Sequence, residues 1–332
     1  DSKRLFTLQV DTRQVKTEPI MQYVPQDGSA RPTLLAADRP LAHPGDEHVE
    51  LFQLLSINVA SGDCCEMNYP PMNTGYSHQW GVFDGELAWW AKDNQHIYCV
   101  ELERGDHTLR LLEANMNTGD VRVLFEENSK THINFFPEFP AKPLHRSLPD
   151  TNELIWWSQR SGWGHLYLYD LSTGGLKRTL TSGDWVVRDV LLVNEKRREV
   201  FIQTAGRVAG RNPYYRDVCR VNIDTGEITT LASSDEDIAV FYQQSHREHT
   251  SIGMLQAYSC PTNGISPAGD YIVITGSRVD QAPVSQLINR EGEMVMILEE
   301  ADILSLPKGW QWPEPISVTA ADGETPLHGV IF

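Results

Sequence analysis

One turn sequence recurs along this 332-residue chain and constrains the fold more than any other feature. Its form is [N/D]-x-x-[S/T]-G, and its four copies end at Gly62, Gly119, Gly174 and Gly226. A looser fifth copy, Asn289-Arg-Glu-Gly292, is one residue shorter. An Asn or Asp side chain caps such a turn, while Gly supplies a backbone conformation with positive φ. We therefore expect the first four glycines to lie in tight hairpin turns, most of them with positive φ.

The segments on either side of each turn have the pattern of strands. An apolar-rich segment precedes the turn and an alternating one follows it, as in HLYLY (165–169) and LKRTL (176–180). Each repeat holds a further strand upstream. These upstream strands are KRLFTLQV (3–10), ELAWWA (86–91), ELIWWS (153–158), EVFIQT (199–204) and YIVITG (271–276). The turn glycines are spaced 57, 55, 52 and 66 residues apart.

Three or four antiparallel strands in a period of roughly 40 to 60 residues are typical of a β-propeller blade. The repeats therefore predict an all-β fold with at least five consecutive blades of three to four antiparallel strands. The predicted blades span 3–68, 86–126, 153–181, 199–232 and 270–298. Helical character is confined to EEADILSL (299–306). The alternative fold is a pair of β-sandwiches with similar hairpins.

Two tryptophan doublets occupy the same place in successive repeats, Trp89-Trp90 and Trp156-Trp157. Neighbouring residues of a strand face opposite sides of the sheet. One ring of each doublet should therefore enter the packing layer on each side of its blade, which favours a packing role over a cofactor platform.

Composition excludes several classes of function. The net charge of −17 disfavours nucleic acids and anionic membrane surfaces, because binding to either needs clustered Lys and Arg. No apolar run approaches the ~20 residues of a membrane span. The five cysteines contain no C-x-x-C pair, so we predict neither a zinc site nor a disulfide framework, and expect mostly reduced core thiols. The cysteines are Cys64, Cys65, Cys99, Cys219 and Cys260. We predict no metal and no other cofactor.

Several segments resemble the N-terminal propeller domain of dipeptidyl peptidase IV-like enzymes, which belong to the prolyl oligopeptidase family. The internal ones are LPDTNELIWWSQRSGWGHLYLYD (148–170), LTSGDWVV (180–187), GRNPYYRDVCRVN (210–222) and ISPAGDYIVIT (265–275). The stretch 1–15 resembles the strand that follows a family blade motif, and 313–332 looks like the family's linker strand. The resemblance implies that 1–312 are part of an eight-bladed propeller whose N-terminal blades are missing. It also implies that 313–332 lead into an absent α/β-hydrolase domain.

The resemblance further implies a serine exopeptidase that releases Xaa-Pro or Xaa-Ala dipeptides. In that family the propeller restricts entry to short or unfolded peptides and holds the free N-terminus of the substrate, while the hydrolase domain carries the Ser-His-Asp triad. The implied partners are the hydrolase domain, peptide substrates and, for the full-length protein, a second copy in a homodimer. Localisation stays open between cytoplasm and periplasm, because we expect the natural N-terminus to precede Asp1.

We predict no catalytic residue within the chain, because it lacks the G-x-S-x-G nucleophile elbow. Ser77 and Ser266 lie in incomplete matches to that pattern. The acidic pair that holds substrate in the family would precede Asp1. We interpret Glu126-Glu127 and Glu299-Glu300 as solvated charges that follow outer strands.

Substrate-lining residues are predicted only in the aromatic connector 131–139, at Phe135 and Phe136. In the family a Phe and an Arg from roughly this connection approach the substrate. The alternative is that these rings bury a long loop against a blade. His246 and His249 have metal-pair spacing without a third ligand, and we read them as loop residues.

The stretch SQRSGWGH (158–165) is expected to form a hairpin tip shaped by Arg160 and Trp163, with Gly162 and Gly164 permitting the turn. A second function fits the same fold, namely a stand-alone propeller that binds or scaffolds other proteins without peptidase activity.

Overall fold

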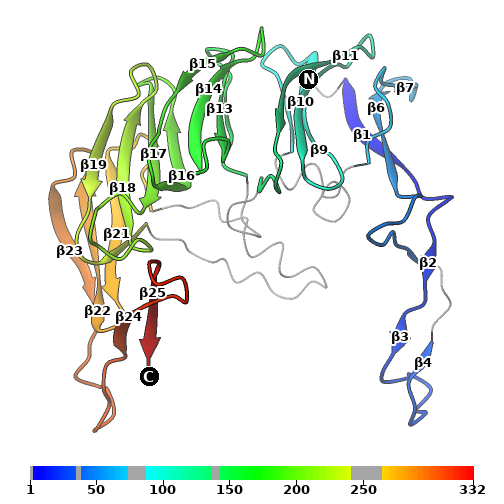
Figure 1. The fold of residues 1–332 in the computed structure, drawn as a ribbon. Helices are drawn as coiled ribbons and strands as arrows, with labels where there is room; N and C mark the ends of the chain where they lie inside the picture. Colours follow the sequence, from blue (N-terminus) through cyan, green and yellow to red (C-terminus); the bar gives the residue numbers. More distant parts are fainter. Residues whose placement is uncertain (1–2, 35–38, 74–86, 136–142, 241–263) are drawn as a thin grey trace. The chain divides into compact units, whose positions relative to one another are not determined.

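The structure is a computed structural model that describes residues 3–34, 39–73, 87–135, 143–240 and 264–332 (Figure 1). These residues form strands and turns and contain no helix. None of them, accordingly, makes a helix of the length and apolarity that a membrane span requires. The chain divides into two compact units, Asp1–Ile133 and Asn134–Phe332, each described by itself.

Two antiparallel sheets, blades 1 and 2, dominate the first unit. Blade 1 has the order β1-β6-β7, and blade 2 has the order β11-β10-β9-β8. The strands of blade 1 are β1 (Arg4–Asp11), β6 (Leu51–Asn58) and β7 (Cys64–Glu66). Those of blade 2 are β8 (Ala88–Trp90), β9 (His96–Leu102), β10 (Thr108–Asn115) and β11 (Val121–Asn128). Two small sheets between β1 and β6 contain β2 (Thr17–Glu18), β3 (Met21–Gln22), β4 (Thr33–Leu34) and β5 (Arg39–Pro40).

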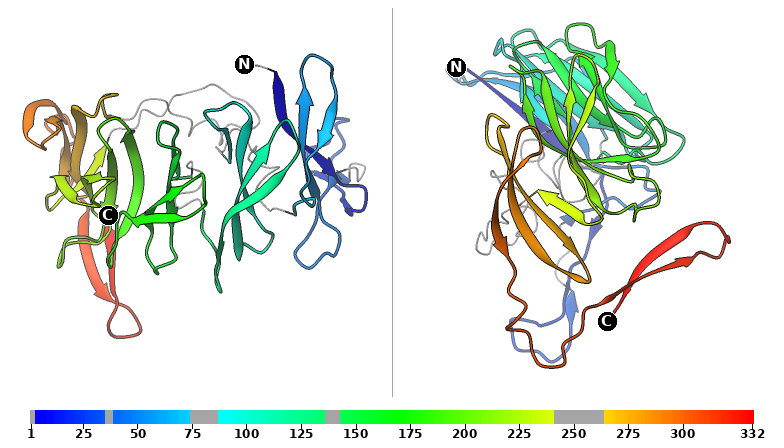
Figure 2. Two further views of the ribbon diagram at one scale, coloured as in Figure 1. Left: turned by 90° about the horizontal axis from the view of Figure 1, so that it is seen from above. Right: turned by 90° about the vertical axis from the view of Figure 1, so that its left-hand side faces the viewer.

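The second unit contains blades 3, 4 and 5, each with four strands in sequential order, followed by a C-terminal hairpin (Figure 2). Blade 3 contains β12 (Arg146–Leu148), β13 (Glu153–Ser158), β14 (His165–Asp170) and β15 (Leu176–Thr179). Blade 4 contains β16 (Val186–Asn194), β17 (Glu199–Ala205), β18 (Arg216–Asn222) and β19 (Ile228–Ala232). Blade 5 contains β20 (Asp237–Val240), β21 (Tyr271–Arg278), β22 (Gln281–Asn289) and β23 (Met294–Glu300). The hairpin pairs β24 (Glu314–Thr319) with β25 (Pro326–Ile331).

Each of the five predicted repeats forms a separate antiparallel sheet, which confirms the all-β prediction. Blades 3, 4 and 5 nevertheless begin one strand earlier than predicted, with β12, β16 and β20. The helical interpretation of 299–306 was wrong. Glu299 and Glu300 complete β23 opposite Ser285 and Val284, so pairing with β22 outweighs local helix propensity there.

The repeated turns are built as their sequence indicates. Gly62, Gly119, Gly174 and Gly226 have φ values of 77°, 82°, 73° and 77°. In blade 3, Oδ1 of Asp170 accepts hydrogen bonds from the backbone N–H groups of Ser172, at 2.7 Å, and Thr173, at 3.3 Å. The N–H of Gly174 donates to the carbonyl of Asp170 at 2.8 Å. One side chain therefore satisfies two turn donors, and the glycine closes the hairpin.

Neighbouring blades of the second unit pack face to face through apolar layers. Between blades 3 and 4, one buried cluster contains Trp157 from blade 3 and Trp185 from the segment that enters blade 4. Between blades 4 and 5, a second buried cluster contains Phe201 from blade 4. Trp156 is buried on the face of β13 opposite to Trp157, as the doublet predicts. The expectation was wrong for Trp90, which is 40% exposed at the end of the short edge strand β8.

The cysteine expectation was correct for only part of the chain. Cys99 and Cys219 are buried free thiols within strands. Cys64 and Cys65 are exposed, because they lie on β7, the short outer strand of blade 1. Cys260 lies outside the described residues.

Candidate functional site

Phe135, the described member of the predicted substrate-lining pair, is held in an aromatic cluster. Its ring lies 5.8 Å from the ring of His145 and 5.3 Å from that of Trp156, and those two rings are 5.7 Å apart. The Phe135 side chain is 6% exposed, so its ring contributes to packing on blade 3. Phe136 lies outside the described residues, and the substrate-lining role of the pair stays a prediction.

The hairpin tip between β13 and β14 is organised by Arg160. Its guanidinium lies 4.3 Å from the ring centroid of Tyr167 and 5.6 Å from that of Tyr169. It also donates to the hydroxyls of Tyr169, at 2.5 Å, and Ser158, at 3.0 Å. These contacts fix Arg160 against its own blade.

The two glycines of this tip serve different purposes. Gly162 has a φ of 94° and makes the turn possible. Gly164 is needed for space, because a Cβ there would lie 2.2 Å from the ring of Trp157. The expectation that a glycine permits the turn is therefore confirmed for Gly162. It was wrong for Gly164, which is required by its packing against Trp157 and has no positive φ.

His165 begins β14 and is fully engaged within its blade. Nε2 lies 2.9 Å from the carbonyl oxygen of Gly183, and Nδ1 lies 3.0 Å from the hydroxyl of Thr181. The Thr181 hydroxyl already accepts the N–H of Leu166, so it donates to Nδ1, and Nε2–H donates to Gly183. Burial lowers the pKa of His165 and keeps the ring neutral. His165 is therefore a core histidine and not a candidate general base.

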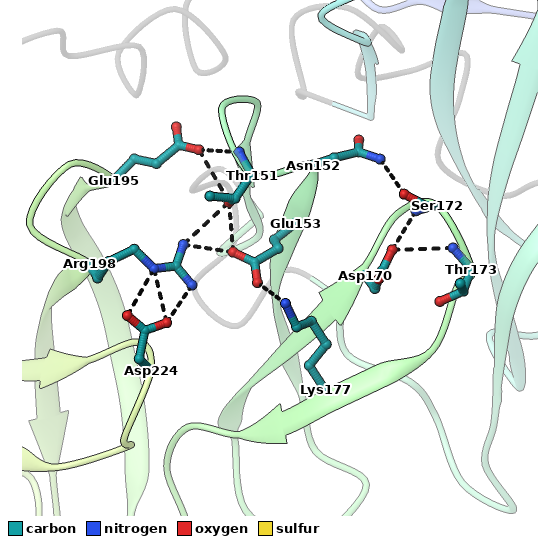
Figure 3. Close-up of polar contacts among 10 residues, drawn as sticks. All are labelled: Thr151, Asn152, Glu153, Asp170, Ser172, Thr173, Lys177, Glu195, Arg198 and Asp224. Atoms are coloured by element: carbon teal, nitrogen blue, oxygen red, sulfur yellow. Dashed lines mark hydrogen bonds and ion pairs between the residues drawn. The ribbon is translucent and has the colours of Figure 1, made fainter.

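A buried carboxylate, Glu153, joins blade 3 to blade 4 (Figure 3). Its side chain is 3% exposed and accepts hydrogen bonds from Lys177 Nζ at 2.5 Å, Arg198 Nη1 at 2.7 Å and the Thr151 hydroxyl at 2.7 Å. Arg198 lies in the turn before β17 and also donates to Asp224 at 2.8 Å. We call these five residues the Glu153 junction.

The Glu153 junction balances its own charges. Burial favours the neutral acid, but the hydrogen bonds from Lys177, Thr151 and Arg198 outweigh it and hold the pKa of Glu153 below its ordinary value of 4.5. Two cations then face two carboxylates, Glu153 and Asp224. The junction consequently fits an inter-blade connection better than a substrate anchor.

The same arrangement recurs between blades 4 and 5. Glu199 is the first residue of β17, as Glu153 is the first of β13. It pairs with Arg220 on β18 at 3.6 Å and with Arg290 in the turn between β22 and β23. Sequence reasoning missed both carboxylates by treating them as ordinary strand ends. The signal was available, because ELIWWS and EVFIQT both place Glu directly before an apolar run.

The acidic pairs lie within outer strands and not after them. Glu126 and Glu127 belong to β11, and Glu299 and Glu300 belong to β23. Glu126 accepts a hydrogen bond from Arg110 Nε at 2.5 Å, and Arg110 is its direct partner in the strand register. Glu126 is exposed, as expected of a solvated charge, and in addition belongs to a cross-strand ion pair.

Among the described residues, the remaining candidates do not assemble a reactive centre. The hydroxyl of Ser266 accepts the N–H of Tyr271 at 3.0 Å and closes the turn before β21. Ser77, His246 and His249 lie outside the described residues. In the part of the chain that the structure describes, no group of three or more His, Cys, Asp or Glu residues is placed to hold a metal ion.

Comparison with known families and curated proteins identifies close similarities. Residues 1–262 match the model of the Dipeptidyl peptidase IV (DPP IV) N-terminal region. The dipeptidyl peptidase 4 of Trichophyton equinum is 33% identical over 168 residues, which cover 48% of this chain and 20% of that protein. The dipeptidyl peptidase 4 of Arthroderma otae is 24% identical over 169 residues, with the same two shares.

Solved structures show the fold to which the blades belong. Porphyromonas gingivalis dipeptidyl peptidase 4 has a TM-score of 0.69 and 15% identity, covering 99% of this chain and 40% of that one. A candidate dipeptidyl aminopeptidase IV from Bacteroides ovatus has a TM-score of 0.66 and 21% identity, and the match covers 98% of this chain and 42% of that one. The fold is therefore a β-propeller, and the chain spans less than half of either protein. Since the family model matches most of its length, the chain belongs to the family of dipeptidyl peptidase IV N-terminal regions.

Proposed function

We propose that the chain is the substrate-gating and substrate-binding propeller domain of a serine exopeptidase that releases Xaa-Pro or Xaa-Ala dipeptides. The Ser-His-Asp groups belong to an α/β-hydrolase domain outside this chain. Residues 1–312 contribute blades to an eight-bladed propeller, and 313–332 lead into the hydrolase domain. The observation that carries the proposal is the family match over residues 1–262.

The blade junctions support a gating role. A gate excludes folded proteins only if its wall does not widen when they press against it. Buried ionic contacts at Glu153 and Glu199, added to continuous apolar layers, resist separation of neighbouring blades. The net charge of −17 also favours the approach of a substrate with a protonated N-terminus.

In this proposal Phe135 and Phe136, in the connector 131–139, line the substrate chamber. The packing of Phe135 against His145 and Trp156 supports a fixed position for this part of the connector. Phe136→Ala in the full-length enzyme should raise KM for an Xaa-Pro substrate with a smaller effect on kcat, because it removes binding surface and no reacting group.

The proposal is tested on the full-length protein with a chromogenic Xaa-Pro substrate. We expect release of the dipeptide, and loss of activity after treatment with a serine-directed phosphonate. We also propose a homodimer, to be checked by sedimentation. An intact full-length protein that cleaves neither Xaa-Pro nor Xaa-Ala substrates would shift the assignment to the stand-alone binding or scaffold propeller.

A further inference from the structure

The two sides of the second unit carry different loop chemistry. On one side lie the turns between third and fourth strands, capped by the polar residues Asp170, Asn222 and Asn289. On the other side lie the loops between second and third strands, which present exposed apolar or aromatic side chains. These side chains are Trp163 in blade 3, Val208 and Tyr214 in blade 4, and Val279 in blade 5. Each of these three loops therefore exposes at least one apolar or aromatic side chain on this side of its blade.

The loop between β17 and β18 is pinned firmly to its blade. Nη2 of Arg211 donates to Asp217 Oδ2 at 2.8 Å, in an ion pair whose two side chains are 6% and 1% exposed. Nη1 donates to the hydroxyl of Ser233 at 3.2 Å and to the carbonyl of Ser234 at 2.5 Å. Arg211 thereby joins this loop to the segment that leads to β20. A loop fixed in this way loses little conformational freedom when it binds a partner.

Tyr214 projects from this pinned loop. Its side chain is 70% exposed, and its backbone N–H donates to the side-chain oxygen of Asn212 at 3.0 Å. The ring meets the ring of His328 edge to face, with centroids 6.1 Å apart and planes 82° apart. His328 lies on β25 opposite Ser317 and is one of the few partly buried residues of the C-terminal hairpin. From the pinned loop and this ring contact, we infer that Tyr214 is the docking point of the β24–β25 hairpin on the propeller.

The hairpin has a second face that this contact leaves exposed. Val318 pairs with Leu327 in the strand register, and Ile331 lies on the same side of the sheet, away from His328. All three are exposed. One face of the hairpin thus contacts blade 4 while the other presents an apolar strip. Tyr214 accordingly sets the direction in which the hairpin leaves the propeller, whatever activity the full-length protein has.

The inference is tested by hydrogen exchange with mass spectrometry on the 332-residue chain. The variants are Tyr214→Ala, Tyr214→Phe, which keeps the ring, and Tyr271→Ala, which removes an exposed tyrosine at the start of β21. An aromatic pair of this geometry changes an opening equilibrium by a factor of about two to ten. Amides of 314–331 should therefore exchange about two- to tenfold faster in Tyr214→Ala. Both control variants should exchange like the unmodified chain.

Each result decides the inference. Faster exchange confined to the hairpin in Tyr214→Ala, with unchanged exchange in blade 4, supports docking through the ring. Equal hairpin exchange in all four proteins overturns it. Faster exchange in Tyr271→Ala as well also overturns it, because the effect would then not depend on the Tyr214 contact. Since Tyr214 is exposed, loss of its side chain leaves the blade core intact, which unchanged exchange of β17 and β18 verifies.

Discussion

At the scale of single residues, two turn glycines with the same backbone conformation meet different surroundings. Gly226 and Gly292 have φ values of 77° and 87°. A Cβ on Gly226 would make ordinary contact with the carbonyl oxygen of Leu180 at 3.5 Å. A Cβ on Gly292 would lie 2.3 Å from the carbonyl oxygen of Leu231, in the outer strand of the neighbouring blade. Gly292 is therefore required both by its φ and by the close approach of another backbone.

This difference predicts unequal costs for the same substitution. Gly226→Ala should destabilise the second unit by about 1 kcal/mol, the cost of a left-handed conformation for alanine. Gly292→Ala should cost about 3 kcal/mol, because a backbone carbonyl must also move. Urea unfolding followed by tryptophan fluorescence measures both variants against the unmodified chain. Equal midpoints for the two variants would contradict the packing argument at Gly292.

At the scale of strands, buried glutamates at the starts of β13 and β17 connect each blade to the next. Removing one charge from such a buried pair leaves its partners without full compensation. In the Glu153 junction the loss is moderated, since Lys177 is half exposed and Arg198 keeps its bond to Asp224. The junction should consequently contribute less than a fully enclosed pair.

We expect Glu153→Gln to destabilise the second unit by about 2 kcal/mol at pH 7. Because the folded pKa of Glu153 lies below its ordinary value of 4.5, its stabilisation is present above that value. It is lost as pH falls through the folded pKa. The difference in the free energy of unfolding between Glu153→Gln and the unmodified chain, measured by urea unfolding, should thus become smaller below pH 4.5.

The control for this measurement is Glu195→Gln. Glu195 lies at the edge of the Glu153 junction, where its carboxylate accepts hydrogen bonds from the N–H and the hydroxyl of Thr151. This substitution should change stability by less than about 0.5 kcal/mol. If Glu153→Gln lowers the free energy of unfolding by the same amount from pH 7 to pH 3, the carboxylate charge of Glu153 does not contribute to stability.

The outer strand of blade 5 exposes five consecutive apolar residues, Met294 to Leu298. An edge strand of this kind offers both unpaired backbone groups and apolar side chains to a second molecule. The 332-residue chain should therefore self-associate as its concentration rises. Placing lysine at Val295 and Ile297 should reduce association, as measured by sedimentation velocity. Lysine at the exposed Tyr23 and Val24 serves as the charge-matched control and should leave association unchanged.

Sequence patterns were informative wherever one short stretch determines a structure. The Asp170 turn is such a case, because its cap and its glycine lie within five residues. Strands β12 and β20 contain only three and four residues, too few for alternation to be visible. The position of Glu153 depends on Arg198 in another blade, and the burial of Phe135 depends on Trp156. Contacts between distant segments are not encoded in any local pattern.

At the scale of the whole molecule, the described residues form blades and a hairpin, and we propose that catalysis depends on residues outside this chain. A serine peptidase requires an activated nucleophile, a positioned base and an oxyanion hole. The nucleophile elbow that brings these together is absent from the sequence. Removing triad members from a serine protease costs many orders of magnitude in rate. We therefore expect no partial peptidase activity from the 332-residue chain.

The most direct test compares the 332-residue chain with the full-length protein on the same Xaa-Pro chromogenic substrate, with a fluorescent fluorophosphonate as a label for reactive serine. We predict that the full-length protein turns over substrate and takes up the label, while the 332-residue chain does neither. Turnover by the 332-residue chain that is abolished by the fluorophosphonate would contradict the assignment of catalysis to residues outside it.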